Sequence, residues 1–143
     1  MAESKRPGGL TALAVINFVF SAFTALGVVG LVTYLAVADD PEKAKAFHET
    51  HLDEVSAAAL YASIALGVVR VGLMIAAGVG YLGQKRVLGR TVGSLYGALG
   101  LLSIVSDIVA LHAPVGIFTI IALIYPVLTL ILLNTTFKDD LVN

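Results

Sequence analysis

The chain has 143 residues and contains no cysteine, and only 13% of its residues are charged. Without cysteine there are no disulfides, no catalytic thiol and no Cys-ligated metal or cluster. A soluble domain carries about 25% charged residues, so too little polar surface remains here to cover a soluble globule. The composition excludes a secreted or cytosolic enzyme, a nucleic-acid binder and a disordered chain, and it predicts an integral membrane protein.

Hydrophobic residues make up 58% of the chain, and they gather in four stretches at 7–38, 55–84, 91–113 and 113–137. Each stretch exceeds the ~20 residues that cross a hydrocarbon core of about 30 Å as a helix. We therefore expect an all-α integral membrane protein, a four-transmembrane-helix antiparallel bundle forming a single domain over residues 1–143. Its helices are expected at approximately 9–38, from 41 or 55 to 84, 89–112 and 114–135.

Basic residues indicate the orientation of this bundle. The loop between the first two helices holds Lys43 and Lys45. The other side holds six basic residues: Lys5, Arg6, Lys85, Arg86, Arg90 and Lys138. The positive-inside rule then places both termini in the cytoplasm (N-in/C-in). The short clusters of two basic residues at 5–6 and 85–86 are also expected to contact anionic lipid.

The opening segment RPGGLTALA, residues 6–14, resembles the start of small bacterial four-helix membrane proteins. This resemblance covers about a tenth of the chain. It implies the bacterial cytoplasmic (inner) membrane as the location, and it implies no activity.

Two charges interrupt the apolar stretches, Arg70 in the second and Asp107 in the third. Arg70 lies 15 residues before Lys85, about 22 Å along a helix, and Asp107 lies 17 residues after Arg90, about 26 Å. Similar heights on antiparallel helices predict a buried ion pair. Such a pair either fixes the register of the helices or serves as a gate, a proton-linked site or an anion contact.

Polar residues recur at spacings of three, four or seven and so mark one face of each helix. They are expected to form a polar interior: Asn17, Ser21, Thr24, Ser63, Ser103 and Tyr125. This interior either holds the bundle together through interhelical hydrogen bonds or lines a polar pathway.

Small residues spaced by four form two stripes that allow close helix packing: Gly72, Ala76 and Gly80, and Gly89, Gly93 and Gly97. The stripes serve either packing within one bundle or contact between subunits.

The first outer loop carries helix signals, with Asp39 or Asp40 as a cap and Pro41 at the first helical position. We expect residues 41–55 to be helical and to continue into the second membrane helix. The alternative is a short interfacial helix that bends near Thr50. Phe47 is expected to contact a neighbouring chain or the lipid interface.

Imidazole and carboxylate groups on the outer side suggest a possible metal site, and the candidates are His48, His51, Glu54 and His112. The alternative is a solvated polar loop.

No phosphate-binding, dinucleotide-binding or nucleophile motif occurs in the sequence, so we expect no enzyme and no cofactor. The function predicted is that of a small tetraspan structural or interaction protein, or an accessory subunit. Its partners are the lipid bilayer and either further copies, in a homo-oligomer, or a larger membrane complex, without nucleic acid. The alternative is an oligomeric channel or transporter in which Arg70, Asp107 and the inward polar faces line the path.

Overall fold

The computed structural model describes residues 7–110 and 114–141. Its long helices are α1 (Gly8–Val37), α3 (Ala57–Leu82), α4 (Val92–Ala110) and α5 (Ile117–Asn134). The π-helical turn η3 (Arg86–Thr91) leads into α4, and together they form one span. The four spans are long and apolar enough to cross a membrane. For the described residues the all-helical class and the presence of four membrane-length helices are confirmed.

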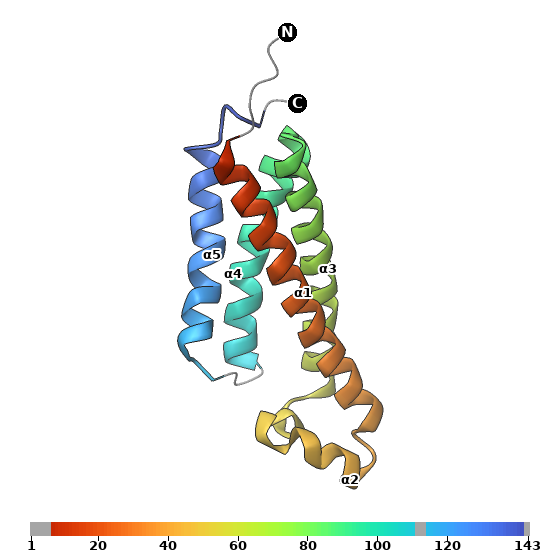
Figure 1. Cartoon of the computed structure of the whole chain (residues 1–143). Coiled ribbons are helices and arrows are strands. Elements are labelled where there is room, and N and C mark those ends of the chain that lie inside the picture. The colour runs from red at the N-terminus through yellow and green to blue at the C-terminus, as the bar shows by residue number, and fades with distance from the viewer. Residues whose placement is uncertain (1–6, 111–113, 142–143) are drawn as a thin grey trace.

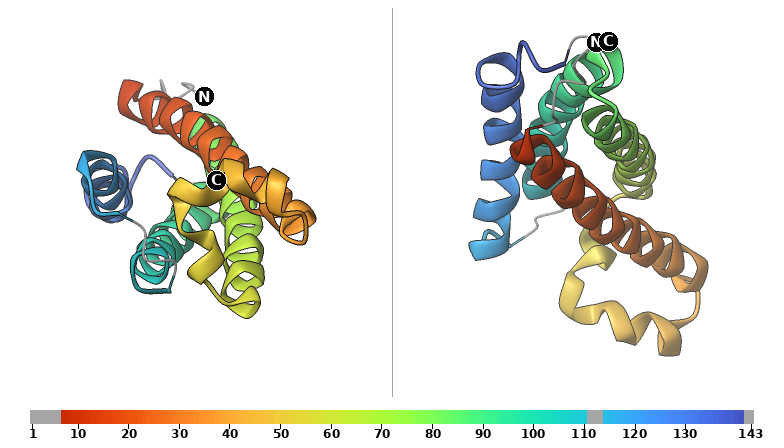
Figure 2. Two further views of the ribbon diagram at one scale, coloured as in Figure 1. Left: turned by 90° about the horizontal axis from the view of Figure 1, so that it is seen from below. Right: turned by 45° about the horizontal axis from the view of Figure 1, so that its top comes forward.

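The helices form an elongated bundle in which α1 lies obliquely across α3, while α4 and α5 stand beside them (Figures 1 and 2). α1 packs along α3, α3 against α4, and α4 against α5. Both described ends of the chain and the turn from α3 to η3 lie at one end, which we call the termini end. The opposite end, which carries α2 (Pro41–Ala44), is called the α2 end.

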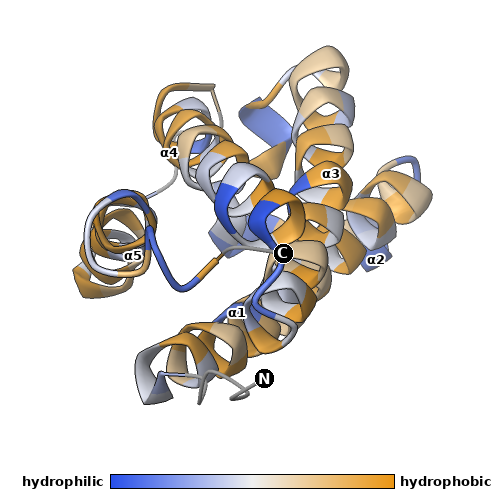
Figure 3. Cartoon of the chain, turned by 90° about the horizontal axis from the view of Figure 1, so that it is seen from above, coloured by the Kyte–Doolittle hydropathy of each residue, from blue (hydrophilic) through white to orange (hydrophobic). Residues whose placement is uncertain are grey.

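The long helices consist mostly of apolar residues (Figure 3), and many of their large apolar side chains are exposed. Phe118 is 83% exposed, Ile117 70% and Val109 69%. Such side chains would be unfavourable against water, whereas the hydrocarbon of a bilayer matches them. The chain therefore has the surface of an integral membrane protein.

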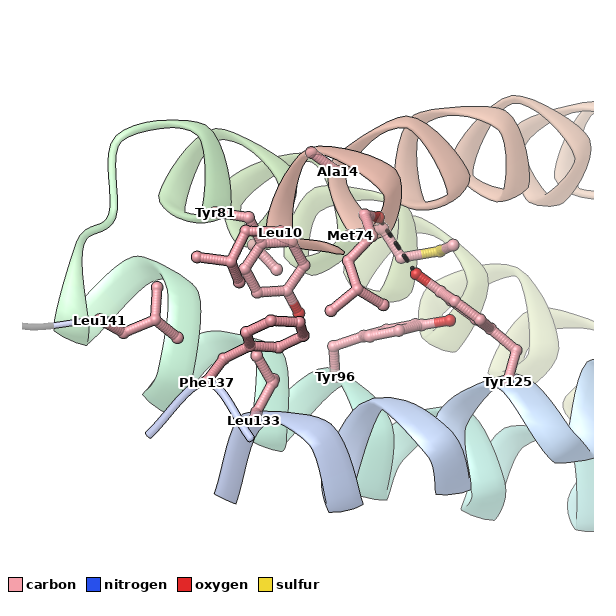
Figure 4. Packing of buried hydrophobic residues seen from close by; sticks show 11 residues of the cluster. Leu10, Ala14, Met74, Tyr81, Tyr96, Tyr125, Leu133, Phe137 and Leu141 are labelled. Atoms are coloured by element: carbon pink, nitrogen blue, oxygen red, sulfur yellow. Dashed lines mark hydrogen bonds between the residues drawn. The ribbon is translucent and has the colours of Figure 1, made fainter. Parts of the chain in front are cut away.

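The main core lies towards the termini end, where all four long helices contribute (Figure 4). Its members are Leu10, Leu13, Ala14, Met74, Ala77, Tyr81, Tyr96, Tyr125, Leu133, Phe137 and Leu141. The last two follow α5 and fold back over this end of the bundle. Beyond this cluster the buried apolar side chains of the described residues are few: Tyr34, Leu60, Ile104 and Pro126. The bundle is thus packed more completely at its termini end than at its α2 end.

Three small residues of the predicted stripe on η3 and α4 pack inside the chain. A methyl group on Gly89 would meet Leu141, one on Gly93 would meet Tyr81 and Leu133, and one on Gly97 would meet Leu130. The reading as packing within one bundle is supported at all three glycines.

The stripe predicted on α3 takes part in this packing only at one end. Gly80 lies against the backbone of Leu88 and Gly89, and Ala76 is half-buried. Gly72 is exposed, and a methyl group added there would meet no other part of the described chain within 4 Å. It lies two residues from the buried Met74, roughly 200° around the helix, and therefore faces away from α1 and α4. A role for Gly72 in packing within the chain was wrong, and its role in subunit contact stays a prediction.

The loop between α1 and α3 does not continue into the second membrane helix, so that prediction was wrong. Asp40 caps α2 as predicted, accepting hydrogen bonds from the backbone of Glu42 and Lys43. The 3-10 turns η1 (Lys45–Thr50) and η2 (Leu52–Glu54) follow. His51 between them has a left-handed φ of 52°, so the bend that the alternative predicted near Thr50 is present. The interfacial position of this segment stays a prediction.

A second break in this loop comes from Ser56, whose hydroxyl accepts a hydrogen bond from the backbone of Ala59 and begins α3. A capping serine in extended conformation ends any continuous helix before it. Phe47 packs edge-on against Tyr34 of α1, with the ring centroids 5.6 Å apart. The aromatic contact expected for a neighbouring chain or lipid is therefore made within the chain.

Candidate functional site

A pocket of about 320 Å³ lies between α1, α3 and α4. Its polar lining consists of Thr24, Ser63, Arg70, Ser103 and Asp107. The predicted polar faces of α1, α3 and α4 therefore meet in part, whereas Asn17, Ser21 and Tyr125 do not line this pocket. The pocket is partly open, because α1 and α4 both pack against α3 but scarcely against each other.

The local sequence explains why these side chains share one space. Ser63, Gly67 and Arg70 are four and three residues apart on α3, and Ser103 and Asp107 are four apart on α4, so each set lies on one helix face. At Gly67 the side chain of Val28 occupies the place where a Cβ would be. The glycine lets α1 approach α3 closely and so closes one wall of the pocket.

Arg70 and Asp107 share this pocket without touching. The salt bridges formed by the described residues join Lys43 to Asp40 and His51 to Glu54, and Arg70 makes none with Asp107. The two charges do interact electrostatically, and Ser63 also interacts with the carboxylate. The predicted pair is thus an interaction across a shared pocket, and its energetic coupling stays a prediction.

Part of the Arg70 guanidinium is left without a partner. Its Nε atom is buried and makes no hydrogen bond. An unpaired buried N–H costs free energy comparable to a lost hydrogen bond. The site therefore holds a donor that an incoming acceptor would satisfy once the side chain shifts within the partly open pocket, because Nε itself has almost no exposed surface.

A polar layer closes the bundle on the termini side of the pocket. The Asn17 side chain donates from Nδ2 to the Met74 carbonyl at 3.2 Å, and Tyr125 donates to Asn17 Oδ1. Asn17 is fully buried and Tyr125 is nearly so. The remaining predicted polar residues of α1 bond to their own helix, Ser21 to the Phe18 carbonyl and Thr24 to that of Phe20. The hydrogen bonds of Asn17 join α1 to α3 and to α5. They hold the bundle together, which is one of the two roles predicted for the polar interior.

The proposed metal ligands are not brought together. His51 Nδ1 lies 3.5 Å from a carboxylate oxygen of Glu54, and His48 does not join them. Within residues 7–110 and 114–141 there is no group of three or more residues able to hold a metal ion. His112 lies outside the described residues. The solvated-loop alternative fits what the structure describes.

A second group of charged residues lines pockets at the termini end, namely Arg86, Arg90 and Lys138. The sequence predicted them only as determinants of orientation and, for Arg86, as a lipid contact. The spacing of four between Arg86 and Arg90 was the one feature of the sequence that indicated a shared helix face. The position of Lys138 beside the arginines could not be predicted from the sequence. It depends on contacts of the tail after α5 with distant residues, and such contacts produce no periodic pattern.

Comparison of the chain with protein-family models, curated proteins and solved structures found no match. The functional argument therefore depends on the chain's own geometry. The pocket between α1, α3 and α4 offers one guanidinium, one carboxylate and several hydroxyls, a set suited to binding polar groups.

Proposed function

We propose that the chain is a small tetraspan membrane protein that acts without enzymatic activity, as a structural or interaction subunit. It assembles with further copies or as an accessory subunit of a larger membrane complex. The pocket of Arg70 and Asp107 is its binding site for a polar group on a neighbouring transmembrane helix. The observation that carries this proposal is the buried, unpaired Nε of Arg70 in a partly open pocket.

The energetics of a membrane interior favour such a role. A charge at the bilayer centre costs at least ~2.5–3.5 kcal/mol on insertion scales. Arg70 and Asp107 are expected in the outer half of the bilayer, where the cost is smaller, and they do not compensate each other by direct contact. A neighbouring helix that presents an acceptor to Arg70 or a donor to Asp107 reduces this cost. Interhelical hydrogen bonds in membranes contribute ~0.6 kcal/mol on average. Several such bonds make the association specific.

A channel or transporter is the second candidate, and the polar lining of the same pocket favours it. The layer of Asn17, Met74 and Tyr125 fills the bundle on the termini side. A continuous path would therefore run between copies of the chain and not through one copy.

Because the chain has no cysteine, an introduced cysteine carries the single thiol of the chain, and the unchanged cysteine-free protein reports labelling of other proteins. Leu31→Cys places a thiol on the lining of the pocket. Val32→Cys places one on the next residue of α1, which is 49% exposed and outside the pocket. In native membranes a thiol-linked photo-crosslinker on the first variant should yield a defined protein adduct, either a dimer of this chain or a complex with one other protein.

The matched controls decide the result. The adduct should be absent for Val32→Cys and should be lost when Leu31→Cys is combined with Arg70→Leu and Asp107→Leu. A monomeric native mass with lipid adducts alone contradicts the interaction role. If the protein supports a flux of ions or solutes in proteoliposomes and Asp107→Asn abolishes that flux, the interaction role would be replaced by the transport alternative.

A further inference from the structure

Two adjoining pockets at the termini end share Arg86 and Arg90 in their linings. One, of about 290 Å³, is completed by Lys138, Asp139 and Leu141. The other, of about 260 Å³, is completed by Thr91, Ser94 and Asn134. Three cations and one carboxylate therefore surround a space with several neutral hydrogen-bonding groups beside it. This composition suits an anion.

The arginines are presented by η3. The π-helical turn Arg86–Thr91 holds two arginines four residues apart, which is just short of one π-turn, so both lie on nearly the same face. Arg90 Nε lies 3.5 Å from Asn134 Oδ1, and Asn134 Nδ2 donates to Ser94 at 3.2 Å and to the Leu130 carbonyl at 2.9 Å. This network orients Arg90 through its Nε and leaves the two terminal nitrogens for a ligand.

The tail after α5 supplies the third cation from a fixed position. Phe137 and Leu141 on either side of Lys138 are buried, 8% and 1% exposed. Gln84 Nε2 also donates to the Asp140 carbonyl at 3.3 Å. Lys138 is therefore held opposite the arginines although its own side chain is exposed.

We propose that Arg86, Arg90 and Lys138 bind the phosphate group of an anionic lipid. Arg86 begins one span and Asn134 ends another, so the pockets lie at the level where a bilayer has its headgroups. Guanidinium groups bind phosphate oxygens in pairs, and basic pockets beside membrane helices are suited to anionic headgroups. This site lies at the end of the bundle away from α2 and is independent of the proposed role of Arg70 and Asp107.

The test is native mass spectrometry of the full chain in neutral detergent with phosphatidylglycerol or phosphatidylcholine. Arg90→Gln should weaken phosphatidylglycerol binding by roughly fivefold, since one basic residue near an anionic surface has an effect of that order. Arg86→Gln and Lys138→Gln should each act similarly. Lys85→Gln is the matched control, because it removes one charge from the same end but lines neither pocket. Lys85 adds only a general attraction to anionic lipid, so its loss should weaken phosphatidylglycerol binding less than the loss of Arg90.

Two further arms complete the test. Unchanged thermal unfolding of each variant with phosphatidylcholine shows that lost binding is not lost folding. Inorganic phosphate that competes with phosphatidylglycerol at equal concentration would show a soluble phosphate as the ligand and overturn the lipid assignment. Equal binding of the two lipids, or an equal loss in Lys85→Gln and Arg90→Gln, would overturn the site.

Discussion

Tyr125 on α5 donates its hydroxyl hydrogen to the side-chain oxygen of Asn17 on α1, across a separation of 108 residues in the chain. The same hydroxyl lies 3.3 Å from the Leu13 carbonyl oxygen. The Tyr125 ring also contacts Phe20 and Tyr96, with centroid distances of 4.9 and 6.4 Å. One side chain thus joins α5 to α1 by hydrogen bonding and to α4 by packing.

Tyr125→Phe should lower the free energy of unfolding by about 1–2 kcal/mol, because it keeps the ring but leaves the buried Asn17 oxygen unpaired. Thermal or denaturant unfolding in detergent measures the loss. Tyr61→Phe is the control, since Tyr61 is 63% exposed and its change should be neutral. Equal stability of the two variants would contradict a structural role for the Asn17 contact.

Gly80→Ala should destabilise the fold by about 1–3 kcal/mol, because the added methyl group would overlap the backbone of Leu88 and Gly89. Gly72→Ala is the matched control on the same helix. It has open space and replaces a glycine within a helix, so its expected effect is a gain of about 0.5–1 kcal/mol. If Gly72→Leu lowers the native mass of an assembly while leaving the monomer stable, Gly72 lies in a subunit contact.

Arg70→Leu and Asp107→Leu should each cost about 2 kcal/mol, because each leaves the other charge uncompensated in a half-buried site. The double variant should be more stable than the sum of the two losses predicts. A double-mutant cycle by thermal unfolding measures the coupling, for which we expect about 0.5–2 kcal/mol. Simple additivity would show that the two charges act independently.

The loop at the α2 end should loosen in acid. The Lys43 ammonium, 2.8 Å from the Asp40 carboxylate, and the backbone hydrogen bonds of the cap hold the pKa of Asp40 below its usual value of 3.8. The charged form is thus favoured in the folded loop. Its contribution is present above pH 3.8 and is lost as the pH falls through the lowered pKa.

We therefore expect the amide hydrogens of residues 42–44 to lose protection below pH 4. Their exchange should be faster there than the pH dependence of the intrinsic exchange rate alone explains. Asp40→Asn keeps a capping side chain but has no titrating group, so its protection should not depend on pH in this range. Parallel pH profiles of the two proteins would contradict the role of the Asp40 charge.

Both ends of the chain should face the cytoplasm. Ala46→Cys and Thr136→Cys place single thiols at exposed positions at the two ends of the bundle, without changing a charge. An impermeant thiol reagent added to intact cells should label the first variant and not the second. The reverse pattern would overturn the orientation inferred from the six-to-two basic asymmetry.

The sequence predicted the parts of the fold that depend on one helix alone. Hydropathy located the four spans, and spacing identified the inward faces of Ser63, Arg70, Ser103 and Asp107 because helical periodicity is a local property. What it missed depends on distant parts of the chain. No periodicity shows that the tail around Lys138 folds back, or that Gly72 lies on a face of α3 that no other helix of the described chain covers.

The loop between α1 and α3 is a second place where the sequence pattern did not predict the structure. Residues 41–55 carry helical spacing, yet His51 adopts a left-handed conformation and Ser56 starts a new helix. Propensity is a weak guide in a segment where capping and the contact of Phe47 with Tyr34 decide the path.

The contact between Asn17 and Tyr125 has a consequence for the order in which the bundle assembles. The hairpins α3–α4 and α4–α5 bring together neighbours in the chain, whereas this contact closes a loop of more than one hundred residues. Closure of a long loop carries an entropic cost that short-range contacts do not. Docking of α5 against α1 should therefore follow insertion of the helices as a separate, later event. Until it takes place, the amide of Asn17 lacks its partner on α5.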